Sequence, residues 1–434
     1  MIWRVILVIL SAVVLGAHFL RAEQPGLTAV CLAAPLLLLW KTRWALRAVQ
    51  ALLAAAGLVW IDTLARLAAA RMSAGAPWLR MALILGVVAA VTWVAALVLG
   101  ARRVRDRYPG EGAAVSVPLA AFLLTAGLLS IVHVKVRLTL LLAERFLPGA
   151  GWVELFALAV YAAWVSGRML DLNRTPVVRL RSWLLFSVVF FVQLGLGLAG
   201  VHECLQTGKL HLPVPAVIVA GPLFRGEGLF MVILFLAMVA VVGPAWCSHL
   251  CYVGGWDALA ATARKRPSAM PRWRRAAQVT SLALVAAAAL GLHAAGVDGY
   301  TAAWFGLGFG VAGVGIMATL SRKKGVMVHC TSYCPIGLVA TWLGRLNPFR
   351  VRLNGNCTEC GLCRLACRYD ALSMDDIRRR KPGPSCTLCG DCLAPCRHGA
   401  MEYRFPGLSP SAARQVFLVL VTSLHAVFIA VARI

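Results

Sequence analysis

Charged side chains are scarce in this chain. Its 434 residues include 17 Asp and Glu, and charged residues make up 14% of the total, against 60% that are hydrophobic. Soluble domains carry about a quarter charged residues, so the composition excludes a soluble globular enzyme. The apolar excess also excludes intrinsic disorder, because disordered chains are poor in hydrophobic residues.

Common catalytic and cofactor signatures are also missing. The sequence has no nicotinamide fingerprint, no phosphate-binding glycine loop and no Ser/Thr-Gly-Ala-Thr site for covalent flavin. It therefore offers no catalytic residues of its own. The first apolar run carries Arg4, and no small-residue cleavage site follows it, so we expect a retained span rather than a signal peptide.

Basic residues are in excess, and 43 Lys and Arg give a formal net charge of +26. In a soluble protein this charge would suggest nucleic-acid binding. Here the cations gather in alternate loops between apolar runs, as they do in the cytoplasmic loops of polytopic membrane proteins. We therefore predict a lipid bilayer, and no nucleic acid, as the partner of these charges.

Eleven apolar runs are long enough to be candidates for crossing a membrane. They are residues 2–20, 26–40, 48–65, 79–101, 114–133, 152–170, 182–201, 227–246, 276–295, 301–320 and 413–433. The second is short, and we expect it to pair with the first as a helical hairpin. The positive-inside rule places the N-terminus and the polar segment 321–412 in the cytoplasm and the C-terminus outside, in a bacterial inner membrane.

Eight of the 14 cysteines form two runs with the same spacing, C-x2-C-x2-C-x3-C. Residues 357–367 are CTECGLCRLAC, and residues 386–396 are CTLCGDCLAPC. Such a loop wraps three iron corners of a [4Fe-4S] cube, and in two-cluster ferredoxins the fourth cysteine of each run ligates the other cluster. The predicted ligands are Cys357, Cys360, Cys363 and Cys396 for cluster 1, and Cys386, Cys389, Cys392 and Cys367 for cluster 2.

Two alternatives for these runs fit less well. Zinc sites use two separated cysteine pairs rather than two runs of four, and disulfides are disfavoured on the reducing cytoplasmic side. We expect Gly361 and Gly390 where the backbone passes close to the cluster. Arg368 and Arg397 stand where bacterial ferredoxin runs have proline, and we expect their charge to raise the cluster potentials.

A second pair of cysteine motifs follows two of the apolar runs. Residues 247–251 are CSHLC and residues 330–334 are CTSYC, each with the spacing C-x3-C. On a helix, a spacing of four puts both thiols on one face. The candidates for a third metal or redox centre are therefore Cys247, Cys251, Cys330 and Cys334, with His249 and His329 as alternative ligands. Packed reduced cysteines and a redox-active dithiol remain open at this point.

Histidines and acids near the outer ends of the spans form a weaker set of candidates. His133, His202, His211 and His293, together with Glu203, could ligate haem b or hydrogen-bond a quinone. Asp62 and Glu227 are further acids at or near the membrane that could accept protons. The alternative is that these groups are ordinary interfacial side chains.

The segments WCSHLC and YCPIGLVATWLGRLNPFRVRLNGNCTECGLCRLAC, with the second cysteine run, resemble the NapH/NosR/CcoG type of membrane-bound polyferredoxin over about residues 182–405. The resemblance implies electron transfer between the quinone pool, or another membrane carrier, and a partner oxidoreductase, for example as a quinol-dehydrogenase subunit. It also implies an alternative, a maturation factor that reduces copper for a respiratory metalloenzyme. Tyr252 follows the first C-x3-C motif where the family has proline.

These observations predict an all-α polytopic membrane protein of about eleven transmembrane helices with a small cytoplasmic α+β ferredoxin-like module holding two clusters. Four domains are predicted. They are a membrane module of unassigned function (1–175), a polyferredoxin-type membrane module (176–345), the two-cluster module (346–405) and a C-terminal transmembrane helix (406–434).

Overall fold

The computed structural model describes residues 2–39, 43–101, 104, 113–204 and 212–431. The chain forms two compact units, Met1–Gly112 and Ala113–Ile434. The four predicted domains stay predictions. His211, one of the predicted quinone or haem residues, lies outside the described residues.

The first unit consists of two helical hairpins. Its elements are α1 (Ile2–Arg21), α2 (Pro25–Ala33), a 3₁₀ turn (Ala34–Leu39), α3 (Arg43–Ser73) and α4 (Leu79–Leu99). Gly16 of α1 lies against Leu32 of α2, as the predicted first hairpin requires. In the second hairpin, the absence of a side chain at Gly57 admits the indole of Trp93, whose Nε1 donates to the carbonyl of Ala54.

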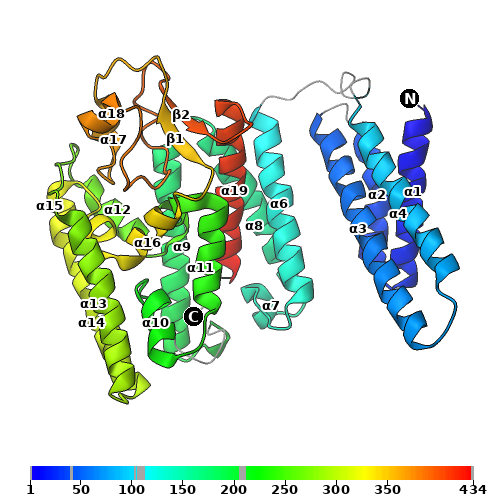
Figure 1. Ribbon diagram of the computed structural model, residues 1–434, viewed down its shortest axis with the longest axis horizontal. Coiled ribbons are helices and arrows are strands. Elements are labelled where there is room, and N and C mark those ends of the chain that lie inside the picture. Colours follow the sequence, from blue (N-terminus) through cyan, green and yellow to red (C-terminus); the bar gives the residue numbers. More distant parts are fainter. Residues whose placement is uncertain (1, 40–42, 102–103, 105–112, 205–211, 432–434) are drawn as a thin grey trace. The chain divides into compact units, whose positions relative to one another are not determined.

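The second unit contains most of the helices (Figure 1). They are α6 (Ala113–Lys135), α7 (Leu142–Phe146), α8 (Gly151–Met169), α9 (Thr175–Leu198), α10 (Val217–Arg225), α11 (Phe230–Val242), α12 (Gly254–Thr262), α13 (Arg274–Ala294), α14 (Gly299–Ile316), α15 (Arg322–Lys324), α16 (Pro335–Leu343) and α19 (Pro410–Val431).

Nine helices of the described chain are long and apolar enough to cross a membrane, where the sequence predicts eleven. The predicted span 26–40 is divided between α2 and the 3₁₀ turn, and the apolar stretch Gly26–Leu39 is too short. The predicted span 152–170 forms α8, a helix of 19 residues whose apolar character is reduced by Glu154 and Arg168.

Helix α19 lies in the middle of the second unit and packs against α6, α8 and α9. Small buried residues, Ala121, Ala162 and Ala426, let α6, α8 and α19 approach closely. The hydroxyl of Ser423 donates to the carbonyl of Ala121 across this contact. The C-terminal helix is therefore part of the core rather than an appended anchor.

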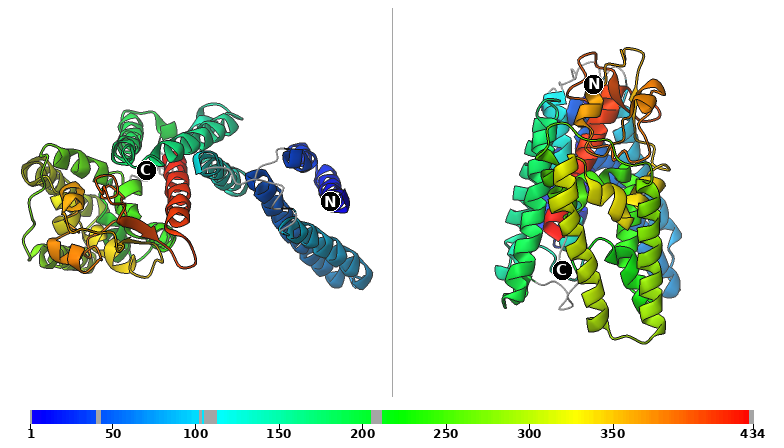
Figure 2. Two further views of the ribbon diagram at one scale, coloured as in Figure 1. Left: turned by 90° about the horizontal axis from the view of Figure 1, so that it is seen from above. Right: turned by 90° about the vertical axis from the view of Figure 1, so that its left-hand side faces the viewer.

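The polar segment folds onto one end of the helices of this unit (Figures 1 and 2). We call residues 350–404 the cysteine module. It contains α17 (Leu362–Ala366), α18 (Met374–Arg378) and two antiparallel strands, β1 (Arg350–Leu353) and β2 (Met401–Arg404). Val351, Leu353, Met401 and Tyr403 alternate with polar residues along the strands and face inward.

One hydrophobic core joins the cysteine module to the membrane helices. Tyr403 of β2 and Phe349, just before β1, both pack on Phe417 of α19, which is fully buried. Trp183 of α9 and Phe235 of α11 belong to the same core. The module is thus fixed to the helices by buried aromatic contacts.

Candidate metal centres

The described cysteines other than Cys31 and Cys204 fall into three groups of four. Cys357, Cys360, Cys363 and Cys396 line one small cavity and form the first cysteine group. Cys367, Cys386, Cys389 and Cys392 interact electrostatically with one another and form the second cysteine group. Cys247, Cys251, Cys330 and Cys334 line another cavity and form the third cysteine group. All of these thiols are free of disulfides.

Each of the first two groups takes three cysteines from one sequence run and the fourth from the other run. Cys396, the last cysteine of the second run, lies with the first three cysteines of the first run. Cys367, the last cysteine of the first run, lies with the first three of the second. This is the ligand pairing that the sequence predicts for two [4Fe-4S] clusters.

The two cysteine loops have the same backbone conformation. Glu359 and Leu388, at equivalent positions, have φ angles of 59° and 58°, and Gly361 and Gly390 have φ angles of 73° and 82°. A positive φ is costly for a residue with a side chain, so its repetition indicates a backbone shaped for a ligand. Gly390 also admits the hydroxyl of Tyr403, which would lie 2.7 Å from an added Cβ.

In both runs, a backbone amide donates a hydrogen bond to the fourth cysteine, the one that lies with the cysteines of the other run. The N–H of Ala371 donates to Cys367 Sγ, and the N–H of Ala400 donates to Cys396 Sγ, each at 3.2 Å. Each donor lies four residues after its cysteine, which gives the two runs a second equivalent feature. Hydrogen bonds to the ligand sulfurs are one of the factors that set cluster potentials.

The third group is built from two π turns rather than from regular helix. The turns are Trp246–Leu250, which follows α11 and a short 3₁₀ turn, and His329–Tyr333, which precedes α16. In each motif the second cysteine donates its N–H to the carbonyl five residues earlier, at 3.0 Å for Cys251 and 2.8 Å for Cys334. The expected common helical face is thus replaced by wider turns, a feature often found at functional sites.

In each C-x3-C motif, the glycine seven residues after the first cysteine lies close to the carbonyl oxygen of that cysteine. A Cβ at Gly254 would lie 3.2 Å from the carbonyl oxygen of Cys247, and a Cβ at Gly337 would lie 2.5 Å from that of Cys330. At Gly337, the absence of a side chain is what allows the backbone to close around the cysteines.

Side chains from other segments hold the backbone of the third group. The amide of Gln278 donates to the carbonyls of Cys330 and Cys334, at 2.9 and 3.0 Å, and Asp257 accepts from the N–H of Cys330. The indole of Trp183 donates to the carbonyl of Cys251. The hydroxyl of Tyr369, two residues after Cys367, donates to the carbonyl of Cys247 at 3.1 Å.

The two neighbouring histidines differ in position. His329 lines the cavity of the third group, and its Nδ1 is buried without a hydrogen-bond partner among the described residues. Burial lowers the pKa of His329 to about 4, so its imidazole is neutral. His249 instead packs edge-on against Phe417, and its carbonyl accepts from Nδ1 of His425. His329 is therefore the histidine with access to this site.

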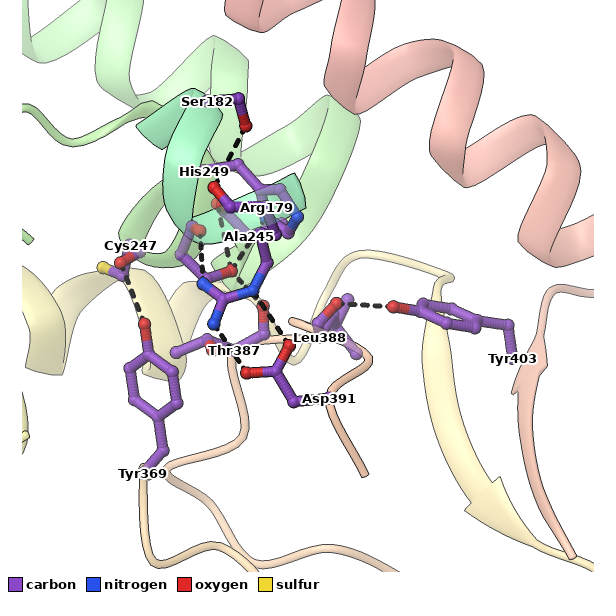
Figure 3. Close-up of polar contacts among 11 residues, drawn as sticks. Arg179, Ser182, Ala245, Cys247, His249, Tyr369, Thr387, Leu388, Asp391 and Tyr403 are labelled. Carbon is purple, nitrogen blue, oxygen red and sulfur yellow. Dashed lines mark hydrogen bonds and ion pairs between the residues drawn. The ribbon is translucent and has the colours of Figure 1, made fainter. Parts of the chain in front are cut away.

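A buried ion pair connects the second and third groups (Figure 3). Arg179, near the start of α9, donates to both carboxylate oxygens of Asp391 at 3.0 and 2.6 Å, and both side chains are at least nine-tenths buried. Asp391 lies between Cys389 and Cys392. Arg179 also donates to the carbonyl of Ser248, whose hydroxyl donates to the carbonyl of Thr387, the residue after Cys386.

Burial raises the pKa of the more deeply buried thiols in the cysteine module. The pKa rises to about 12 at Cys367, Cys386 and Cys389, with neighbouring thiols as a further cause, and to about 11 at Cys363. Without a metal these groups are neutral thiols at neutral pH. Metal ligation requires thiolates, so deprotonation of these cysteines must accompany cluster binding.

A site for a single metal ion needs closely spaced ligands. A tetrahedral zinc ion with Zn–S bonds of about 2.3 Å brings its sulfurs to within roughly 4 Å of each other. Among the residues that the structure describes, no group of three or more His, Cys, Asp or Glu side chains lies close enough to hold one ion. In the first and third groups, four cysteines line a common cavity.

The two arginines that replace proline, Arg368 and Arg397, differ in burial. Arg397 is exposed, so solvent screens its charge. Arg368 is half-buried, and it donates to the carbonyls of Arg264 and Gly325. Arg179, which the sequence places among the loop cations, is the fully buried cation beside Cys389.

Among the residues that the structure describes, the predicted histidines and acids of the outer ends do not gather around one cysteine group. His133 packs on Trp152, His202 and Glu203 lie exposed in a 3₁₀ turn, and Nδ1 of His293 lies 2.7 Å from the carbonyl of Phe224. Asp62 pairs with Arg66 on an exposed helix surface of the first unit. Glu227 lines a large cavity in the second unit.

Comparison with known proteins supports iron–sulfur binding. A family model described as a 4Fe-4S binding domain matches residues 224–268 and 303–354. The match contains all four cysteines of the third group and ends before Cys357. No curated protein and no solved structure matches the chain. The matched cysteines are thus those of the two π turns, and the match supports an iron–sulfur protein.

Proposed function

We propose that this chain is a membrane-bound electron-transfer protein with three [4Fe-4S] sites, one in each cysteine group. It passes electrons between a membrane carrier such as a quinone and a partner oxidoreductase. The observation that carries the proposal is the arrangement of three four-cysteine groups, two of them linked by direct hydrogen bonds. The family match to the two π turns supports cluster binding at the third group.

The order of the sites follows from the contacts between them. The backbone of the third group is tied to segments of the second group by Tyr369, Ser248 and Arg179. The second and first groups exchange their fourth cysteines, so they are joined through the chain itself. This arrangement supports a linear relay in which the second group lies between the third and the first.

A [4Fe-4S] cluster supplies one-electron oxidation and reduction when it is bound. The residues of the chain provide the ligands, exclude water and set the local charge. Arg179 places a buried positive charge beside Cys389, and the neighbouring Asp391 offsets it. The amides of Ala371 and Ala400 donate to ligand sulfurs and favour the more negative, reduced state.

The orientation in the membrane follows from the basic residues. The cysteine module lies at the same end of the second unit as the start of α13, where Arg274 and Arg275 contact residues of the module. Positive charge marks the cytoplasmic side. We therefore propose that the clusters face the cytoplasm of a bacterial cell and that α19 ends on the outer side.

Metal analysis tests the proposal directly. We would purify the protein without oxygen, measure iron, acid-labile sulfide and haem, and record EPR spectra during stepwise reduction. Three clusters predict about twelve iron atoms and as many sulfides per chain. About eight would restrict the clusters to the cysteine module and leave the third group as thiols, whereas an absence of sulfide would overturn the proposal.

A further inference from the structure

A large cavity in the second unit contains none of the twelve cysteines of the three groups. It measures about 1050 Å³ and lies between α10 on one side and α13 and α14 on the other. Small side chains on α13 and α14 leave this space open, among them Ala288, Ala302 and Gly306. Its volume is at the upper end of the range for ligand pockets.

The cavity is long and apolar, with a different polar group at each end. Its lining on α13 runs from Ala277 to Leu292, which is about 22 Å of helix at 1.5 Å per residue. One end contains Ser332 and Tyr333, and the other contains Arg225 and Glu227. This shape fits an elongated amphipathic molecule and is too long for a compact polar metabolite.

The end at Ser332 lies against the third cysteine group. Ser332 and Tyr333 stand between Cys330 and Cys334 in the second motif. The ring of Tyr333 stacks on Phe309 with centroids 4.4 Å apart, which provides a flat aromatic wall. The hydroxyl of Ser332 is buried, and it lacks a hydrogen-bond partner among the described residues. A bound carbonyl or hydroxyl group would satisfy it.

The side of the cavity is open to the surface that faces lipid. Leu284 and Phe305 line it and are 64% and 62% exposed. Both belong to helices that are long and apolar enough to cross the membrane. An occupant can therefore enter from the bilayer, and this favours a ligand that is dissolved in the membrane.

We propose that this cavity binds a membrane quinone, with its ring at Ser332, Tyr333 and Phe309 and its isoprenoid chain along α13 and α14. The inference rests on the proposed electron-transfer function, because it assigns the membrane carrier a place beside the third cysteine group. It also differs from the quinone candidates predicted from sequence, which are His133, His202, Glu203, His211 and His293. Glu227, which the sequence analysis names as a further acid near the membrane, lines this cavity.

The test is equilibrium binding of a short-chain naphthoquinone to the purified, cluster-containing protein in detergent. Ala288→Trp fills the cavity from α13, and Ala302→Phe fills it from α14. Ala283→Trp is the matched control, because Ala283 is exposed on α13 and does not line the cavity. Iron content, measured on every variant, shows whether the fold and the clusters survive.

We expect about one naphthoquinone per wild-type chain, at least tenfold weaker binding by both cavity variants, and unchanged binding by Ala283→Trp. Ser332→Ala should weaken binding by about three- to tenfold, the effect of one hydrogen bond. Wild-type binding by Ala288→Trp would overturn the proposal. So would a wild-type protein that binds no naphthoquinone but carries a phospholipid that Ala288→Trp lacks. Because iron is measured separately, loss of the quinone site is distinguishable from loss of the clusters.

Discussion

The cysteine module and the third cysteine group surround their ligand sites in different ways. In the module, each loop shapes itself, with left-handed residues such as Glu359 and Gly361 and an amide donor four residues after Cys367. In the third group, the two π turns depend on side chains from distant segments, such as Trp183 and Gln278. The first kind of site is set by local sequence, and the second by tertiary packing.

This difference predicts where each site can be damaged. A site shaped by its own loop tolerates changes elsewhere, whereas a site held by four separate segments loses geometry when any one of them changes. The second group is intermediate, because its loop is local but the carboxylate between its cysteines pairs with a membrane helix. Four changes, from the largest expected effect to the smallest, test the comparison.

Removing a ligand should have the largest effect and should be confined to one group. We expect Cys330→Ser to lower iron from about twelve to about eight atoms per chain and to abolish one EPR signal while the others remain. Cys363→Ser should remove a different signal. If Cys330→Ser left iron content unchanged, the third group would be packed thiols and the comparison would fail.

Removing Arg179 should damage the second group most. Arg179→Met leaves Asp391 as an unpaired buried carboxylate, which costs about 3–5 kcal/mol. We expect a lower midpoint of thermal unfolding and faster loss of iron to a chelator, together with a shifted potential for the second cluster. The double variant Arg179→Met/Asp391→Leu should recover most of the stability, since it removes both charges. No recovery would show that the pair does more than neutralise charge.

Gln278→Met should weaken the third group alone. The change keeps the side-chain volume but leaves the carbonyls of Cys330 and Cys334 without their donor, at a cost of about 1–3 kcal/mol. We expect the EPR signal of the third group to bleach first on exposure to a chelator. The clusters of the cysteine module are the internal control, and equal bleaching of all signals would contradict a local role for Gln278.

Glu359→Gly should have the smallest effect and the opposite sign. The residue has a positive φ, so glycine relieves about 1 kcal/mol of backbone strain. We expect slower iron loss from the first group. The control is Thr358→Gly, at a neighbouring position outside the positive-φ residues, where added chain entropy should make iron loss faster. Equal effects of the two changes would mean that the φ angle at Glu359 carries no strain.

The features that could be predicted from the sequence depend on residues that lie close together along the chain. The crossed grouping of Cys367 and Cys396 follows from ligand spacing, and the pairing of α1 with α2 follows from two adjacent apolar runs. Nine of the eleven predicted spans form helices that are long and apolar enough to cross a membrane. Of the other two, the span 26–40 is too short, and α8 is made less apolar by its charged residues. The two-cluster count and the predicted quinone residues stay predictions.

The residues that the sequence analysis did not identify make contacts with residues far away in the sequence. Arg179 and Asp391 are 212 positions apart, and Tyr369 reaches Cys247 across 122. The pattern of basic residues assigned Arg179 to a loop. A charged residue within an apolar helix, however, itself indicates a functional role. Gln278 had no motif to mark it. The π turns were also missed, because a spacing of four is equally compatible with regular helix.

The separation between Arg179 and Asp391 has a consequence for biosynthesis. The chain is made from its N-terminus, and domains generally fold as units in that order. Arg179 therefore enters the end of its helix well before Asp391 has been translated, and an unpaired cation there is costly. The ion pair, and with it this contact between α9 and the cysteine module, can therefore form only after the second cysteine loop has been made.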